Sequence, residues 1–232
     1  IASKLSALRD GNEAEAFAAF AGHMVSNEAK FMLNKLVEAV TGKEPEWQET
    51  AVFADASTDQ GKGAEAICRA SGAKAAEGIK VVPMKNSKVL DALKTGKIKS
   101  LYLMGENPLD EEKKVDGAEE ALKQCDFIVV QDIILNETAK LAHVVLPAAA
   151  FAEANGTFTN MEGRVQRIRK AVQAPGVALA DSKILGLLLA QLGEKTGLQS
   201  AEDVFRALDE KVPAYKDMSY ETIEKEGSML IK

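Results

Sequence analysis

The chain has 232 residues, of which 46% are apolar and 28% charged, and its net charge at pH 7 is −6. These values are typical of a globular protein with a sizeable core. The acidic balance disfavours nucleic-acid binding, which relies on clustered Lys and Arg. No apolar run in the sequence approaches the roughly 20 residues that a membrane-spanning helix needs.

The sequence starts with Ile1 rather than Met, and we expect a piece of a longer polypeptide. It has two cysteines, Cys68 and Cys125, and two histidines, His23 and His143. An iron–sulfur cluster or a structural zinc ion needs about four closely spaced ligands. We therefore predict no metal site and two reduced thiols, although the sequence leaves a disulfide open.

Short apolar runs alternate with amphipathic helical patterns, which predicts the α/β class with a parallel, Rossmann-like sheet. Residues 1–98 form the first predicted subdomain. Its expected strands are Glu15–Gly22, Ala51–Ala54 and Ile79–Val82, and its expected helices are Asn27–Val40, Gly63–Ala70 and Asn86–Lys94. Ser26 is the candidate N-cap of the first of these helices, because its hydroxyl can accept from a free N–H group.

Residues 99–180 form the second predicted subdomain, with loops of the kind that bind dinucleotides. Its expected strands are Ser100–Met104, Phe127–Val130 and Val144–Leu146, and its expected helices are Gly117–Gln124 and Asn136–Leu141. Residues 181–232 form a C-terminal helical tail. Its expected helices are Asp181–Leu192 with Asp181 as cap, Ala201–Asp209 with Ser200 as N-cap, and Tyr220–Glu226.

Three polar loops follow strands or begin a helix in the second subdomain: Gly105-Glu106-Asn107, Gln131-Asp132 and Asn136-Glu137-Thr138. Parallel sheets present ligand-binding loops at the carboxyl ends of their strands. A carboxylate such as Asp132 accepts hydrogen bonds from a guanine edge, and a helix start favours a phosphate. The structural alternative is a tight turn followed by a helix cap.

The segment Asn155–Gln166 is dense in amide, hydroxyl and charged side chains, and its centre alternates like a strand. Such a segment either lines a pocket or satisfies its own polar groups internally. Arg167, Arg169 and Lys170 follow as a basic patch suited to a phosphate or an acidic neighbouring subunit. His143 is either a catalytic base or, more commonly for a lone histidine beside a strand, a structural hydrogen-bonding residue.

The residue sequence of Leu101–Gln166 resembles that of a known protein family. It contains Leu-Tyr-Leu-Met-Gly-Glu-Asn-Pro, then Phe-Ile-Val-Val-Gln-Asp, then His-Val-Val-Leu-Pro-Ala, and it closes with Asn-Gly-Thr-Phe-Thr-Asn-Met-Glu-Gly-Arg-Val-Gln. Ser26-Asn27-Glu28 and Pro213-Ala214-Tyr215 add further matches. This order resembles the molybdopterin oxidoreductase family, which includes formate dehydrogenases and the large iron–sulfur subunit of bacterial complex I. The resemblance runs from about Glu13 to the end.

This resemblance implies a set of residues that contact a pterin–guanine dinucleotide if the pocket is retained. They are Gly105, Glu106, Asn107, Gln131, Asp132, Thr138, Gly156, Thr157, Asn160, Gly163, Arg164 and Gln166. The metal-ligating residue and the substrate arginine of active members have no counterpart in this sequence. We therefore expect no catalytic residue in this piece.

Our first hypothesis is a scaffold domain in the large iron–sulfur subunit of a complex I-like NADH dehydrogenase. The whole complex would pass electrons from NADH to a quinone or related acceptor. It would hold no cofactor of its own, with iron–sulfur clusters in a preceding segment or in partner subunits of the complex. We expect a cytoplasmic location, peripheral to the inner membrane. The alternative is the cofactor-binding part of a formate dehydrogenase catalytic subunit that uses bis-molybdopterin guanine dinucleotide. A third hypothesis is a free-standing nucleotide-binding module.

Overall fold

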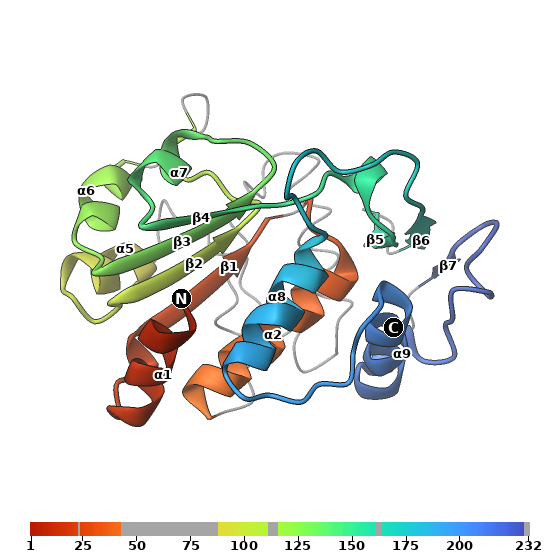
Figure 1. Ribbon diagram of the computed structural model, residues 1–232, viewed down its shortest axis with the longest axis horizontal. Helices are drawn as coiled ribbons and strands as arrows, with labels where there is room; N and C mark the ends of the chain where they lie inside the picture. Colours follow the sequence, from red (N-terminus) through yellow and green to blue (C-terminus); the bar gives the residue numbers. More distant parts are fainter. Residues whose placement is uncertain (23, 43–87, 111–115, 161–163, 230–232) are drawn as a thin grey trace.

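A computed structural model describes residues 1–22, 24–42, 88–110, 116–160 and 164–229. Its centre is a four-stranded parallel sheet with the order β1-β2-β3-β4, which confirms the predicted α/β class (Figure 1). The strands are β1 Phe17–Ala21, β2 Ser100–Met104, β3 Phe127–Asp132 and β4 Val144–Pro147. Because all four run the same way, the loops that follow them meet at one edge of the sheet.

Helices cover both faces of this sheet, as a parallel sheet requires. On one face lie α2 Asn27–Thr41 and α8 Asp181–Gln191, with α1 Ala2–Asp10 and α9 Ala201–Lys211 packed against α2 (Figure 1). On the other lie α5 Lys88–Lys94 and α6 Ala118–Lys123, while α7 Glu137–Leu141 packs beside β3. Alternating side chains of β2 divide between the two cores, with Tyr102 and Met104 on the α2 side and Leu101 and Leu103 on the α5 side.

Local signals set most of these boundaries. Ser26 caps α2 through a 3.2 Å bond from the Ala29 N–H, and Ser200 caps α9 in the same way from Asp203, as predicted. Three short 3₁₀ turns, Ala14–Ala16, Phe151–Glu153 and Pro213–Tyr215, join the larger elements. Helix α1 was not among the predicted elements. It buries Leu5 in the core beneath α2.

A second, antiparallel sheet lies apart from the first. It contains β5 Gly156–Thr159, β6 Arg164–Ile168 and β7 Ser228–Met229, in that order. The blue C-terminal segment in Figure 1 reaches β6 to add β7. The polar segment after β4 is therefore a hairpin of β5 and β6, the β5–β6 hairpin.

Two sequence predictions about the C-terminal part were wrong. Tyr220–Glu226 forms turns rather than a helix, because the chain reverses at Gly227, which has a positive φ, and pairs with β6 directly afterwards as β7. Asp181 does not cap α8: Ala180 is the N-cap, and the Asp181 side chain turns to β3.

Several predicted elements fall outside the described residues, namely Ala51–Ala54, Gly63–Ala70 and Ile79–Val82. The predicted helix at residues 86–94 is described from Lys88 onward, as α5. The boundary drawn at residues 98 and 99 separates β1 from β2, and these two strands pair in one sheet. The three-part division of the chain stays a prediction.

Candidate functional site

The carboxyl edge of the parallel sheet begins with a close approach between two backbone segments. The Gly22 N–H donates to Met104 O over 2.8 Å, and the Gly105 N–H donates to Gln131 O over 2.8 Å. A Cβ on Gly22 would collide with the Gly105 carbonyl oxygen and lie 3.0 Å from Glu106 Oε1. Only glycine leaves room for these loops to lie against each other. Gly105 and the buried Glu106 therefore stand at the base of this edge.

The loop after β2 and the start of α7 do come together. Asn107 Oδ1 accepts from the Thr138 hydroxyl over 2.6 Å and from the Thr138 N–H over 3.3 Å, while Asn107 Nδ2 donates to Glu137. Asn136 Oδ1 caps the helix by accepting from the Ala139 N–H over 2.8 Å. Two amides of the first turn thus bond within the protein, so they do not offer the free N–H groups that attract a phosphate.

Gln131 links the end of β3 to the first residue of α8. It is fully buried, and its Oε1 accepts from the Tyr102 hydroxyl while its Nε2 donates to Asp181 Oδ1 over 2.6 Å. Burial raises the pKa of Asp181 to about 6, against the opposing effect of the Gln131 bond, and the charge of Asp132 raises it further. Gln131 therefore connects the ends of β2 and β3 to the start of α8.

Asp132 is a half-buried acidic group at the end of β3. Its Oδ1 accepts from the N–H groups of Ile133 and Ile134, over 2.7 and 3.3 Å, and its Oδ2 accepts from Asn136 Nδ2 over 2.9 Å. Burial raises the pKa of this carboxyl above its ordinary value. A carboxylate offers about four acceptor positions, so three internal bonds leave room for one external donor.

The β5–β6 hairpin holds the remaining predicted site residues in two groups. Thr157 is fully buried and bonds to α2, whereas Gln166 is exposed. Asn160 and Arg164 close the hairpin by two 2.9 Å bonds, and Arg164 also reaches Glu226 O over 3.1 Å. Gly163 lies outside the described residues. Direct cofactor contact by these residues, and by the buried Gln131 and Thr138, stays a prediction.

Sequence reasoning missed two polar residues that organise the hairpin. Asn27 and Glu28 begin α2 and are both buried. Asn27 Nδ2 donates to Thr157 Oγ1 over 2.9 Å, and its Oδ1 accepts from Thr159 Oγ1 over 3.2 Å. Burial raises the pKa of Glu28 to about 7, despite opposing hydrogen bonds from Thr157 and Tyr220. The sequence contained one indication of these two residues, because Ser26-Asn27-Glu28 resembles a segment of the family. By itself that resemblance indicated only a turn before a helix.

A small cavity opens where the hairpin, the start of α2 and the start of α8 meet. Its wall combines apolar and polar side chains, among them Met24, Ser26, Phe151, Phe158, Asp181 and Ser182. Met24 and Phe151 are both more than 60% exposed, so apolar surface lies open at the rim. The cavity shares Asp181 with the sheet edge, which makes the edge and the hairpin parts of one region.

The other predicted chemical groups have structural partners. His143 Nδ1 accepts from the Ile128 N–H over 3.0 Å, which supports the structural alternative for this histidine. Cys125 is a buried free thiol whose pKa burial raises to about 11. Cys68 and His23 lie outside the described residues. Within the part of the chain that the structure describes, no group of three or more His, Cys, Asp and Glu side chains is placed to hold a metal ion.

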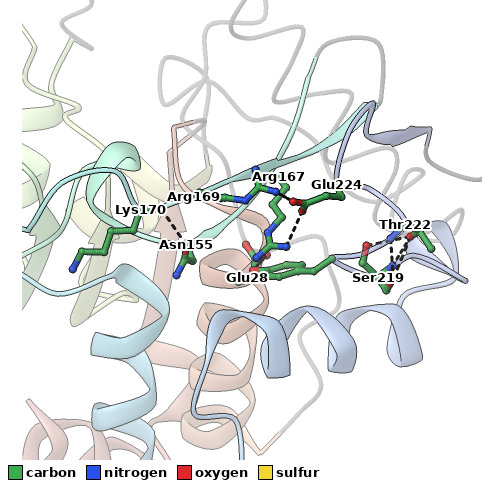
Figure 2. Close-up of polar contacts among 9 residues, drawn as sticks. Glu28, Asn155, Arg167, Arg169, Lys170, Ser219, Thr222 and Glu224 are labelled. Carbon is green, nitrogen blue, oxygen red and sulfur yellow. Dashed lines mark hydrogen bonds and ion pairs between the residues drawn. The ribbon is translucent and has the colours of Figure 1, made fainter.

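The basic patch is partly neutralised inside the protein. Arg167 Nη1 lies 2.9 Å from Glu224 Oε2, and Arg169 pairs with the other oxygen of Glu224. Figure 2 shows both arginines converging on this one carboxylate. The described helices include none that is both long enough and apolar enough to cross a membrane.

Curated relatives share long stretches of this sequence. It is 51% identical over 132 residues to the F420-dependent formate dehydrogenase subunit alpha of Methanocaldococcus jannaschii, covering 56% of this chain and 20% of the relative. A 50% match of the same extent is to F420-dependent formate dehydrogenase 2 subunit alpha of Methanococcus maripaludis. The NADPH-Fe(3+) oxidoreductase subunit alpha of Geobacter sulfurreducens is 37% identical over 127 residues, covering 55% of this chain and 15% of the relative. The chain thus spans about a fifth or less of these proteins.

The two more similar of these relatives are formate dehydrogenase alpha subunits, which favours the formate dehydrogenase hypothesis over the complex I hypothesis. A solved structure, acetylene hydratase from Pelobacter acetylenicus, matches 88% of this chain and 28% of its own with a TM-score of 0.50 and 17% identity, a likeness of fold alone. The family model described as molybdopterin oxidoreductase matches residues 29–191. The chain therefore belongs to the molybdopterin oxidoreductase family.

Proposed function

We propose that this chain is part of the alpha subunit of a multi-subunit formate dehydrogenase, and that its sheet-edge loops hold the guanine nucleotide end of a molybdopterin guanine dinucleotide. The observation that carries this proposal is the 51% identity over 132 residues to a formate dehydrogenase alpha subunit. Membership of the molybdopterin oxidoreductase family supports the class of cofactor.

The donors and acceptors at the sheet edge fit such a group. Gly22 and Gly105 let the loops after β1 and β2 lie against each other, because the Gly105 carbonyl and Val25 Cγ2 occupy the positions that a Cβ on Gly22 and on Gly105 would take. Asp132 keeps an acceptor position for a ring N–H or exocyclic amine of guanine. The two features are adjacent because β2 and β3 pair in register up to Met104 and Gln131.

The chain's own residues bind and orient in this proposal. Asn107, bonded to Thr138, fixes the loop after β2 against α7. Gln131, bonded to Asp181, fixes the end of β3, where Asp132 follows it in the strand. When bound, the cofactor supplies the redox chemistry, and the protein supplies binding, orientation and electrostatics.

The test uses the full-length protein that contains this chain, purified with its partner subunits. Molybdenum and tungsten are measured by elemental analysis, pterin by the fluorescence of its oxidised form, and GMP after acid release. We compare wild type with Asp132→Asn, which keeps an oxygen for the turn but loses charge and acceptor capacity. The control is Asp126→Asn, an exposed position just before β3.

A stoichiometric pterin and GMP signal in wild type and in Asp126→Asn, with a several-fold loss in Asp132→Asn, supports the proposal. Full cofactor content in Asp132→Asn would overturn the role of this carboxylate. Absence of metal and pterin from the wild-type complex would overturn cofactor binding itself and would favour a scaffold domain.

A further inference from the structure

Glu28 is a carboxylate that the proposed cofactor loops do not use, yet it is the most deeply buried acid of the described region. It lies in the first turn of α2 and has no exposed surface. A buried carboxylate is costly unless its oxygens accept several hydrogen bonds. The elements that provide these bonds indicate what Glu28 holds together.

The first element is the β5–β6 hairpin. Glu28 Oε2 accepts from the Thr157 N–H over 2.9 Å, and Oε1 accepts from the Thr157 hydroxyl over 3.0 Å. A Cβ on Gly156 would lie 3.0 Å from Glu28 Oε2 and 3.3 Å from Ser26 Cβ. Strand β5 therefore runs directly against the carboxylate, and the absence of a side chain at Gly156 allows this approach.

The second element is the C-terminal segment. The Tyr220 hydroxyl donates to Glu28 Oε1 over 3.0 Å, across 192 positions of sequence. The guanidinium of Arg167 lies 4.1 Å from the centre of the Tyr220 ring and pairs with Glu224. Arg167 belongs to β6, so the hairpin and the C-terminal segment contact each other as well as Glu28 (Figure 2). These contacts form a closed set that joins α2, the hairpin and the C-terminal segment.

From this geometry we infer that Glu28 is a positioning residue that fixes the β5–β6 hairpin against the start of α2, and thereby places Phe158, which lines the same small cavity as Asp181, beside the sheet edge. The inference rests on the proposed function for its consequence, because the hairpin is placed to serve the cofactor. Asn27 adds a parallel support through Thr157 and Thr159. Glu28 does not touch the cofactor itself in this inference.

The experiment measures amide hydrogen exchange by mass spectrometry on the full-length protein, following peptides that cover residues 155–168 and 213–229. The variants are Glu28→Ala, Glu28→Gln and the control Glu38→Gln, on the same helix. Gln keeps one oxygen for the Thr157 N–H and adds an amide that donates to the hydroxyl of Thr157 or Tyr220. Pterin and GMP content are measured on the same samples.

In Glu28→Ala we expect exchange at least tenfold faster in both peptides, together with a several-fold loss of pterin. Glu28→Gln should restore most protection and most cofactor, and Glu38→Gln should match wild type. If Glu28→Ala is too unstable to purify, Tyr220→Phe removes one of the three bonds and should loosen the 213–229 peptide first.

Unchanged exchange in Glu28→Ala would overturn the positioning role. Faster exchange with full pterin content would overturn its consequence for the cofactor. Should the wild-type protein contain no pterin, the proposed function fails, while the exchange rates still decide whether Glu28 fixes the hairpin. The two failures are therefore distinguishable.

Discussion

Gln131 Nε2 donates a 2.6 Å hydrogen bond to Asp181 Oδ1, and this contact joins the end of β3 to the start of α8. Gln131 also accepts from the Tyr102 hydroxyl, so both ends of its buried amide are bonded within the protein. The sheet edge that carries Asp132 is held by this buried chain of polar groups. A buried donor that loses its partner costs more free energy than the bond contributed.

Asp181→Ala should lower the free energy of unfolding by about 1 to 3 kcal/mol, because the buried Gln131 Nε2 loses its 2.6 Å acceptor and keeps only the 3.4 Å contact with the Asp181 carbonyl oxygen. Asp181→Asn should be at least as stable as wild type, because its amide oxygen can still accept from Gln131 and it removes a charge whose burial raises the pKa of Asp181. Urea denaturation of the full-length protein at neutral pH measures both. Equal losses in the two variants would show that the charge of Asp181, and not the bond, matters.

Glu28 gives the stability of the protein a pH dependence of known sign. Its folded pKa is about 7, above the ordinary value of 4.5, so the folded state holds the proton more tightly. This contribution is full below pH 4.5 and is lost as the pH rises through 7, amounting to about 3 kcal/mol. Gln is neutral throughout. The stability of Glu28→Gln relative to wild type should therefore grow between pH 4.5 and 7 and level off above about pH 8.

Thermal or urea unfolding of wild type and Glu28→Gln at a series of pH values measures this difference in stability. Other titrating groups, including Asp181, act in both proteins and so cancel in the difference. A difference that does not change with pH would contradict the raised pKa of Glu28.

Gly22→Ala should destabilise the protein by about 3 kcal/mol or more, or prevent folding. The new methyl group would collide with the Gly105 carbonyl, which is backbone in a paired loop and cannot turn aside. Circular dichroism and soluble yield of the purified protein measure the effect. A folded, fully stable variant would contradict the close approach of the two loops.

Gly186→Ala should act in the opposite direction. Gly186 lies inside α8, and a Cβ there would meet Met32 Cε at 3.8 Å, an ordinary contact distance. Replacing glycine by alanine within a helix stabilises it by about 0.5 to 1 kcal/mol. A rise in the unfolding midpoint is expected in a thermal melt. A fall would mean that α2 and α8 pack more tightly than these distances indicate.

The parallel sheet and most of its helices could be predicted from local patterns in the sequence. Strand β2 is buried on both faces, so its five-residue run is apolar or small and its ends are clear. Ser26, Asn136 and Ser200 mark helix starts because capping is a local bond between neighbours in the chain. The three polar loops could be found for a similar reason, since two of them follow strands and the third begins a helix.

Which polar residues bond within the core and which stay exposed depends on contacts between segments that are distant in the sequence. Glu28 forms hydrogen bonds with Thr157, 129 positions away, and with Tyr220, 192 positions away. Residue spacing within a helix or strand cannot predict such distant pairs. The sequence predicted Asp181 as a helix cap because this residue stands at the start of α8. In the structure its side chain instead accepts a hydrogen bond from the buried amide of Gln131 on β3. Hydrogen bonds between distant segments form only after the apolar cores have brought those segments together. The sequence pattern therefore shows which residues are polar, but the partner of each is defined only in the folded protein.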